Sequence, residues 1–384
     1  MPRTVLILHS SAGRYGADLQ LLAIARGLDR ARWKPLCVLP ERGELGELLE
    51  QAGAEVAVHP LAVLRRPLLT PLGTARLVRA AGVDRHAIGS IARERDVALV
   101  HSNTSVILSG GAIARAAGAA HLLHVCEIYE GAGGRAGAAL WPALRGRMLR
   151  ADALACISGA VAAQFGGSPR AFVLHDGLPR SPEPVARGAA RDLLGVPPDR
   201  FAVALVGRVS DWKGQDVLAR ALAEPALASI GAVGLVAGDP APGAVVEAGR
   251  LDRLATALGV EDRLVRLGFR SDVDTVLGAA DALVVPSKRP EPLSLVALEA
   301  AAAGLPVVAS DHGGVTEIVR DGETGRLVPP GDPRALAAAL RALADDPASA
   351  AEMGAKGRQD VAERFSLTRM LDELQAVYAR LAPR

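Results

Sequence analysis

Glu291 and Glu299 lie eight residues apart in the segment EPLSLVALEAAAAGLPVVAS, and this spacing suits ligand binding. An apolar strand is expected over Ala282–Pro286, and an alanine-rich helix follows it. We therefore expect Glu291 just before a helix N-terminus and Glu299 about two turns inside that helix. Free backbone N–H groups and the positive end of the helix dipole would lie between the two carboxylates. Such a site suits a phosphate with hydroxyl groups on both sides, as in a nucleotide sugar.

Two cations follow another expected strand, Ala202–Val206. Arg208 comes directly after Gly207, and Lys213 follows five residues later in a short turn. Both would emerge at the carboxyl edge of a sheet, where ligands of parallel sheets bind. Arginine offers two parallel donors and lysine a point charge, which suits a diphosphate. A solvated turn is the alternative for this motif alone, and the glutamate segment at the same edge favours the ligand.

The elements that would position these residues form two successive α/β units. A chain of 384 residues exceeds one ordinary core, and apolar runs separated by helices indicate parallel sheets covered on both faces. In the first half, strands are expected at Val5–Leu8, Leu36–Leu39, Val56–Val58, Ala98–Val100, Leu122–Val125, Ala153–Ile157 and Ala171–Leu174, with helices at Ala17–Leu28 and Glu44–Ala52. In the second half, strands are expected at Ala202–Val206, Val233–Ala237, Leu264–Leu267, Ala282–Val285, Pro306–Ala309 and Arg326–Val328, with helices at Pro333–Leu343, Ala348–Arg364 and Leu367–Leu381. The proline-rich segment Leu178–Ala190 is expected to be the linker.

Composition excludes some partners. The net charge of +2 gives no indication of nucleic-acid binding. Two groups of arginines indicate either a solvated helix face or a peripheral contact with anionic lipid or substrate: Arg65, Arg66, Arg76, Arg79 and Arg85, and Arg135, Arg145, Arg147 and Arg150. The widely spaced Cys37, Cys126 and Cys156 are expected to be reduced core residues of a cytoplasmic protein. The N-terminal apolar run ends before Ser10, which predicts a first strand and not a signal peptide. No apolar stretch has the length of a membrane span.

Four segments resemble, in order, the donor-binding half of GT4-type retaining glycosyltransferases (glycosyltransferase group 1). They are GRVSDWKGQDVLARAL, LGFRSDVDTVLGAADALVVPS, EPLSLVALEAAAAGLPVVASDHGGVTEIVRDGETG and RLVPPGD. The first half is similar more loosely, through Gly13–Leu28 and His124–Glu130. The resemblance implies a GT-B fold of two Rossmann-like domains facing across a cleft. Residues 1–180 would bind the acceptor, residues 181–365 would bind the donor, and the helix over 366–384 would cross back to the N-terminal domain.

The resemblance also implies site residues. Arg208 and Lys213 would hold the diphosphate, Glu291 the hydroxyls of the transferred sugar, and Glu299 the ribose. His124 would lie beside the sugar. Further donor contacts are implied at Gly13, Gly16, Phe269, Arg270, Ser294 and Leu295. Besides the resemblance, His101, Asn103 and Thr104 end an expected strand and are candidate acceptor contacts; His9, at the end of the first strand, is open between a site and a structural role.

The implied reaction moves a hexose from a nucleoside diphosphate sugar, UDP favoured and GDP possible, to an acceptor hydroxyl, with no metal or other cofactor. The acceptor could be an aminocyclitol of a natural product, a lipid carrier or a polysaccharide. Two alternatives stay open: a nucleotide-sugar epimerase of the same fold, and a non-catalytic nucleotide-sugar binding protein. The sequence departs from the family where Leu293-Ser294 replaces the usual Phe-Gly, at Cys126, and at Asp176-Gly177.

Overall fold

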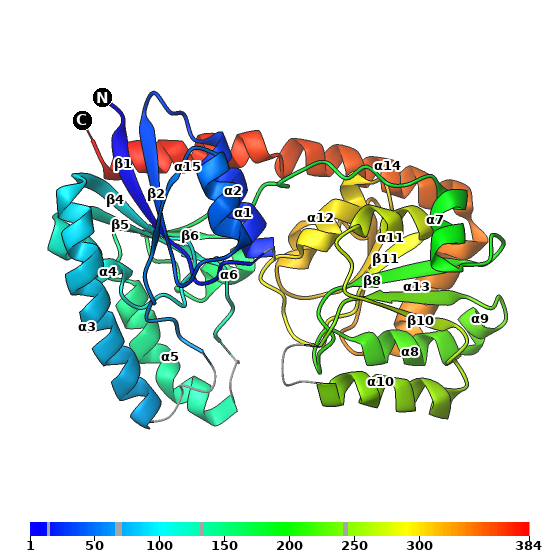
Figure 1. Ribbon diagram of the computed structural model, residues 1–384. Helices are drawn as coiled ribbons and strands as arrows, with labels where there is room; N and C mark the ends of the chain where they lie inside the picture. Colours follow the sequence, from blue (N-terminus) through cyan, green and yellow to red (C-terminus); the bar gives the residue numbers. More distant parts are fainter. Residues whose placement is uncertain (14–15, 66–70, 131–133, 241–244, 384) are drawn as a thin grey trace. The chain divides into compact units, whose positions relative to one another are not determined.

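The computed structural model describes residues 1–13, 16–65, 71–130, 134–240 and 245–383. The chain divides into two compact units, which Figure 1 shows in sequence colours. The N-terminal unit comprises residues 1–179 together with 367–384, and the C-terminal unit comprises residues 180–366. Each unit has its own parallel sheet and its own apolar core.

The sheet of the N-terminal unit has seven parallel strands in the order β3-β2-β1-β4-β5-β6-β7. Its strands are β1 (Arg3–Leu8), β2 (Trp33–Leu39), β3 (Glu55–Val58), β4 (Val97–Ser102), β5 (Ala120–Val125), β6 (Ala153–Cys156) and β7 (Ala171–Val173). Its helices are α1 (Gly16–Gly27), α2 (Glu44–Gln51), α3 (Pro71–Glu94), α4 (Gly110–Ala117), α5 (Gly134–Met148), α6 (Gly159–Ala163) and α15 (Leu367–Leu381). The strand order reverses between β1 and β4, which creates the kind of crevice where α/β sheets bind ligands.

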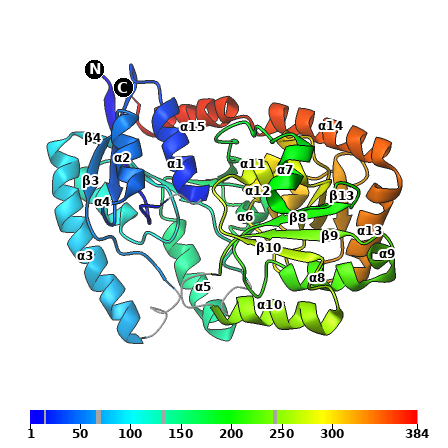
Figure 2. The ribbon, with the colours of Figure 1, turned by 45° about the vertical axis from the view of Figure 1, so that its right-hand side comes forward.

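The last helix, α15, belongs to the N-terminal unit. Its apolar residues recur at helical spacing and fill the core beside α1, which it accompanies in Figure 1 and Figure 2. Tyr378 is fully buried, with its ring 5.4 Å from that of Trp33 and its hydroxyl 2.7 Å from Nδ1 of His101. The expected return of the final helix to the first domain is therefore confirmed.

The sheet of the C-terminal unit has six parallel strands in the order β10-β9-β8-β11-β12-β13, with a reversal between β8 and β11. Its strands are β8 (Ala202–Val206), β9 (Val233–Ala237), β10 (Leu264–Gly268), β11 (Ala282–Val285), β12 (Val307–Ser310) and β13 (Gly325–Val328). Its helices are α7 (Arg187–Leu194), α8 (Gln215–Ala223), α9 (Pro225–Ala228), α10 (Val245–Leu258), α11 (Val273–Ala279), α12 (Leu295–Ala302), the 3₁₀ turn η2 (Gly314–Glu317), α13 (Pro333–Asp345) and α14 (Pro347–Arg364). The expected α/β class with two parallel sheets is confirmed.

Local signals explain several boundaries, and one expectation is wrong. The carboxylates of Asp332 and Asp346 accept backbone N–H groups at the starts of α13 and α14, and a proline occupies the first turn of each helix. The expected linker Leu178–Ala190 is too long, because α7 begins at Arg187. The three prolines lie before that point, and the RGAARDLL segment that follows is amphipathic.

Some cysteines and arginines do not lie where the sequence predicted, in the core or on a solvated helix face. Cys37 and Cys156 are buried, whereas Cys126 is half-buried and is not a core residue. Arg145 donates to the carbonyls of Gln164 and Phe165 at 2.9 and 2.8 Å, so its charged end stabilises a loop. Arg66 and the side chain of Arg135 lie outside the described residues. Across the described ranges, no helix combines the length and the apolarity needed to cross a bilayer.

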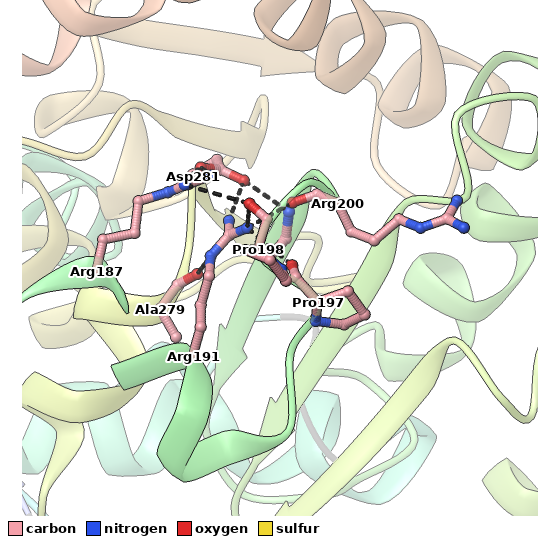
Figure 3. A network of polar contacts seen from close by, with 8 residues as sticks. Arg187, Arg191, Pro197, Pro198, Arg200, Ala279 and Asp281 are labelled. Carbon is pink, nitrogen blue, oxygen red and sulfur yellow. Dashed lines mark hydrogen bonds and ion pairs between the residues drawn. The ribbon is translucent and has the colours of Figure 1, made fainter. Parts of the chain in front are cut away.

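A buried guanidinium joins the first helix of the C-terminal unit to its sheet (Figure 3). Arg191 is 1% exposed and donates to Asp281 at 2.7 Å. Its other donors reach the backbone carbonyls of Pro197, Pro198, Arg200 and Ala279 at 2.8–3.1 Å. Asp281 also accepts the N–H of Ala202 at 2.8 Å, at the start of β8. The network thus fixes the chain that enters the strand leading to Arg208.

Replacement of Arg191 by methionine should lower the free energy of unfolding by about 3 kcal/mol, because four carbonyls and the partly exposed carboxylate of Asp281 lose a buried donor. Arg187→Ala is the matched control. Arg187 contacts the same Asp281 at 3.0 Å with its side chain 54% exposed, so its loss should cost less than about 1 kcal/mol. Urea unfolding of the two variants measures the difference, and equal losses would contradict a special role for Arg191.

Candidate active site

The strand reversal of the C-terminal unit brings together the two motifs that carry the sequence prediction. Arg208 and Lys213 follow β8, and Glu291, Ser294 and Glu299 follow β11, its neighbour across the reversal. Gly214 has a positive φ of 82°, and a Cβ there would lie 2.0 Å from the carbonyl oxygen of Pro286. Glycine at this position lets the loop of Lys213 approach the end of β11 closely.

Lys213 and Glu291 form an ion pair at this edge. The distance from Nζ of Lys213 to Oε2 of Glu291 is 2.9 Å, and Glu291 is 3% exposed. The Ser287 hydroxyl donates to the other carboxylate oxygen of Glu291, and Nε2 of His312 lies 2.8 Å from the Ser287 carbonyl. The Lys213 ammonium also lies 4.7 Å from the centre of the Trp212 ring. Glu291 is therefore held in one orientation by a cation and a hydroxyl.

The N-terminus of α12 offers free hydrogen-bond donors. Ser294 is the N-cap residue, but its side chain caps no backbone N–H. Among the described residues, the N–H groups of Leu295 and Val296 have no acceptor, since the first helical bonds run from Ala297 and Leu298 to the Ser294 carbonyl. Ser294 is 3% exposed and its hydroxyl also has no hydrogen-bond partner. These groups can receive an anion, as expected for a phosphate seat.

Glu299 lies closer to the helix start than expected. It is the fifth residue of α12, so the expectation of two turns is wrong: the helix starts at Leu295, after Pro292 and a non-helical Ser294. Burial raises the pKa of Glu299 from 4.5 to about 7, against the opposing charge of Arg180 and with a smaller contribution from Asp274. Arg180 pairs with Asp274 at 2.7 Å. A half-buried carboxylate of this kind can accept hydrogen bonds from a diol such as ribose.

Phe269 and Arg270 follow β10, two strands away from the reversal. Phe269 is 60% exposed, a large apolar surface that a flat ligand could cover. Arg270 donates to Asp272 at 2.8 Å and lowers the pKa of that carboxyl. The structure therefore gives this segment an exposed ring and a fixed loop.

The N-terminal unit gathers polar groups at its own strand reversal, after β1 and β4. His9 is fully buried, with Nε2 at 2.8 Å from Asp18 and Nδ1 at 3.2 Å from Asn103. The hydroxyl of Thr104 donates to Glu127 at 2.5 Å, and Ser105 donates to the other carboxylate oxygen. Gly13 and Gly16 flank this edge, and residues 14 and 15 between them lie outside the described residues.

His101 and His124 are both fully buried, with stacked rings 5.6 Å apart. Burial lowers the pKa of His124 to about 4 and that of His101 well below 6.5, where the neighbouring His124 adds to the effect. Both rings are therefore neutral near pH 7. Nε2 of His124 lies 3.8 Å from a carboxylate oxygen of Asp176, whose pKa burial raises to about 7. Both side chains are buried inside the N-terminal unit. The site roles of His101 and His124 stay predictions.

Sequence reasoning missed several residues of both edges. They are Asp18, Glu127, Arg180, Asp274, Ser287 and His312. Ser287 and Glu127 each come two residues after a strand next to a predicted site, so their position was a usable signal. Arg180 and Asp274 lie in segments far from α12 in sequence, and only the tertiary structure brings their charges near Glu299.

Comparisons with known proteins agree with this geometry. The family model described as glycosyl transferases group 1 matches residues 187–360. The D-inositol 3-phosphate glycosyltransferase of Saccharomonospora viridis is 40% identical over 202 residues, which cover 51% of this chain and 46% of that protein. The enzyme of the same name from Streptomyces avermitilis is 42% identical over 194 residues, 47% of this chain and 41% of that protein. The chain thus spans about half the length of the curated relatives it matches.

Solved structures match over nearly the whole chain. The Anabaena protein Alr3699/HepE in complex with UDP and glucose has a TM-score of 0.81 and 26% identity, covering 98% of this chain and 99% of that chain. Sucrose-phosphate synthase from Thermosynechococcus elongatus has a TM-score of 0.79 at 23% identity, which shows the fold alone. The fold is therefore that of the GT-B glycosyltransferases. Residues 187–360, most of the C-terminal unit, are similar to the glycosyl transferases group 1 family.

The raised pKa of Glu299 predicts a pH dependence of stability. Its folded-state pKa of about 7 lies above the ordinary 4.5, so the folded state holds this proton more tightly than the unfolded state. The contribution to stability is complete below pH 4.5 and is lost as pH rises through about 7. Glu299→Gln carries no titrating group at this position, so its stability should not fall in this way. Its free energy of unfolding should therefore exceed that of the parent by a margin that grows with pH and reaches about 2–3 kcal/mol near about pH 8.

The matched control is Glu352→Gln, at a fully exposed carboxyl whose pKa Lys356 lowers. This variant should show no gain in stability with rising pH. Urea unfolding at several pH values gives both differences, and parallel curves for the parent and Glu299→Gln would contradict a raised pKa.

Proposed function

We propose that this chain transfers a hexose from a nucleoside diphosphate sugar, preferentially a UDP-sugar, to an acceptor hydroxyl. The observation that carries the proposal is the group formed by Lys213, Glu291 and the free N–H donors at the start of α12. It places cationic and neutral donors beside an oriented carboxylate, the combination needed for a diphosphate attached to a polyhydroxylated sugar. Similarity to a structure that contains UDP and glucose supports the same ligand class.

In the proposed reaction, the bond between the anomeric carbon and the phosphate oxygen breaks while the acceptor oxygen bonds to that carbon. Arg208, Lys213 and the N–H groups of Leu295 and Val296 stabilise the charge that develops on the leaving diphosphate. Glu291 accepts hydrogen bonds from sugar hydroxyls, and Glu299 accepts them from the ribose. Attack occurs on the face that the leaving group vacates, and the leaving phosphate oxygen takes the acceptor's proton, so the anomeric configuration is retained.

Glu291 acts as a hydroxyl acceptor in this scheme and not as a nucleophile. A nucleophile would have to approach the sugar face opposite the leaving group. The ion pair with Lys213 supports the hydroxyl-acceptor role, because it holds the Glu291 carboxylate beside the cation that we assign to the leaving diphosphate. The acceptor would bind in the N-terminal unit, where the polar groups after β1 and β4 gather; an aminocyclitol, a lipid carrier or a polysaccharide are the proposed acceptor classes.

The donor assignment is tested by thermal stabilisation of the chain with UDP-, GDP- and ADP-sugars. We expect UDP-sugars to raise Tm most. Lys213→Ala should weaken UDP binding by about ten- to a hundredfold, the effect of losing one charge-assisted contact, and should leave uridine binding unchanged. Lys356→Ala, at an exposed lysine outside the site, is the control.

Lys213→Ala also leaves the Glu291 carboxylate without its cation, so this carboxylate could repel the diphosphate. The double variant Lys213→Ala/Glu291→Gln removes that repulsion, and the remaining loss of affinity then measures the lost attraction between Lys213 and the diphosphate. Stabilisation by none of the nucleotide sugars would overturn the proposal. Conversion of the donor to an epimer without an acceptor would show the epimerase alternative instead, and binding without any turnover would show the non-catalytic one.

Ser294 is expected to influence the choice of donor sugar, because its unpartnered hydroxyl lies at the N-terminus of α12. Ser294→Ala removes the hydroxyl alone, and Ser294→Gly removes the β-carbon as well. We expect both to change the ratio of kcat/KM between two UDP-hexoses by about three- to tenfold, with UDP affinity unchanged. If only Ser294→Gly changed this ratio, the volume of the β-carbon would determine the donor selectivity, and a hydrogen bond from the hydroxyl would not.

A further inference from the structure

Two carboxylates lie at the carboxyl edge of the sheet in the N-terminal unit. Glu127 comes shortly after β5 and is half-buried, and Asp176 comes shortly after β7 and is 8% exposed. Both lie close to the half-buried thiol of Cys126. Burial raises the pKa of this thiol well above its usual range, and the charges of Glu127 and Asp176 raise it further. The two acidic side chains therefore belong to one place on this edge.

The side chains that contact these carboxylates are neutral. Glu127 accepts hydrogen bonds from the hydroxyls of Thr104 and Ser105. A carboxylate oxygen of Asp176 lies 3.8 Å from Nε2 of His124, a ring that is neutral because burial lowers its pKa to about 4. Burial raises the pKa of Asp176 itself to about 7. Within the described part of the chain, neither carboxylate has a cationic partner, so a cation from outside can neutralise both.

Buried polar atoms at the same edge also lack partners among the described residues. Both ring nitrogens of His124 are without a hydrogen bond, although this side chain is fully buried. Asn103 is 3% exposed, and its Oδ1 is unpaired as well. Its backbone carbonyl oxygen lies 3.9 Å from Sγ of Cys126, which places Asn103 near the two carboxylates. Unpaired buried polar groups are costly, and a neutral imidazole and an amide oxygen together can donate to and accept from hydroxyl groups.

The loop that carries Glu127 is fixed and includes an aromatic side chain. Oε1 of Gln164 accepts the N–H of Tyr129 at 2.6 Å, and Nε2 of Gln164 donates to the carbonyl of Glu127 at 2.9 Å. The Tyr129 hydroxyl lies 2.8 Å from Oγ of Ser105, which donates to Glu127. The Tyr129 ring stacks on that of Trp141 at 5.5 Å, and both side chains are half-buried. An aromatic surface beside a rigid carboxylate suits a saturated ring with an apolar face and polar substituents.

We propose that the acceptor carries an ammonium group on a hydroxylated six-membered ring, the chemistry that amino sugars and aminocyclitols share. An ammonium group has three donors, so it can pair with Glu127 and Asp176 together, while ring hydroxyls bond to His124 and Asn103. A neutral acceptor would leave both carboxylates partly desolvated and without a counter-charge, which disfavours its binding.

This assignment rests on the proposed function and narrows its acceptor. The new glycosidic bond forms at a ring hydroxyl, whose proton goes to the leaving phosphate oxygen as in the transfer proposed above. The ammonium group keeps its protons and serves binding alone.

Two matched pairs of compounds test the proposal, each differing in one group: glucosamine against glucose, and scyllo-inosamine against scyllo-inositol. Isothermal titration of the full chain, with and without saturating UDP, measures the affinities. We expect at least one amine to bind more tightly than its neutral partner by about tenfold or more, the effect of one charge-assisted contact. A preference confined to glucosamine assigns an amino sugar, and one confined to scyllo-inosamine assigns an aminocyclitol. The preferred amine should then receive the sugar from the UDP-sugar that raises Tm most.

Glu127→Gln and Asp176→Asn keep the size of each side chain and remove its charge. Each should weaken binding of the preferred amine by about tenfold and leave its neutral partner and UDP within about twofold. A purely structural role would instead weaken the amine and its neutral partner alike. Glu130→Gln is the matched control, because it removes an exposed carboxylate of the same segment and should leave the affinity for the amine unchanged.

The outcomes separate this assignment from the proposed function. Equal affinity for the amines and their neutral partners, a preference that survives both substitutions, or absence of saturable binding of either amine would each overturn the ammonium site. A bound amine that receives no sugar from a bound UDP-sugar would overturn its role as the acceptor. Amine binding by a chain that no nucleotide sugar stabilises would refute the proposed function and leave the ammonium site assigned.

Discussion

The arrangement of the C-terminal unit depends on one constraint, the reversal of strand order between β8 and β11. Segments that follow two such neighbouring strands leave toward opposite faces of the sheet, and a crevice opens between them. Lys213 and Glu291 enter this crevice from segments far apart in sequence and meet at 2.9 Å. A carboxylate that is 3% exposed would be costly without that cation, so the pair also stabilises the conformation of both loops.

Two glycines allow the loops around Lys213 and Glu291 to approach each other closely. Gly214 and Gly313 both have a positive φ, and a Cβ at either position would overlap a backbone carbonyl, that of Pro286 or that of Glu291. Next to these loops, α12 starts at Ser294 without a side-chain cap. Buried Glu291 and the open N–H donors of α12 therefore lie in neighbouring segments of the chain, where both can contact one anionic ligand.

The N-terminal unit repeats the principle with different chemistry. Its reversal between β1 and β4 also gathers polar side chains, but these pair with one another, as His9 does with Asp18 and Asn103. Burial keeps His101 and His124 neutral, and α15 closes over His101 through Tyr378. One unit thus presents charge and open donors. The other presents a polar edge where many groups pair with one another and Glu127 is a half-buried carboxylate, while Asn103 Oδ1 and both ring nitrogens of His124 have no hydrogen-bond partner among the described residues.

Much of this protein follows from its sequence alone, because strand periodicity and helix caps are local. The strands β8, β9 and β11 have the predicted bounds, and the Asp-Pro pairs at Asp332 and Asp346 mark the starts of two helices. The residue types at the reversal also predict a phosphate seat, and that role stays a prediction. Only the tertiary structure decided that Lys213 pairs with Glu291, that Glu299 is one turn inside α12 with a raised pKa, and that His101 is buried under α15. The reason is physical: pairing, burial and pKa depend on which distant segments approach one another, and no local pattern of residues contains that information.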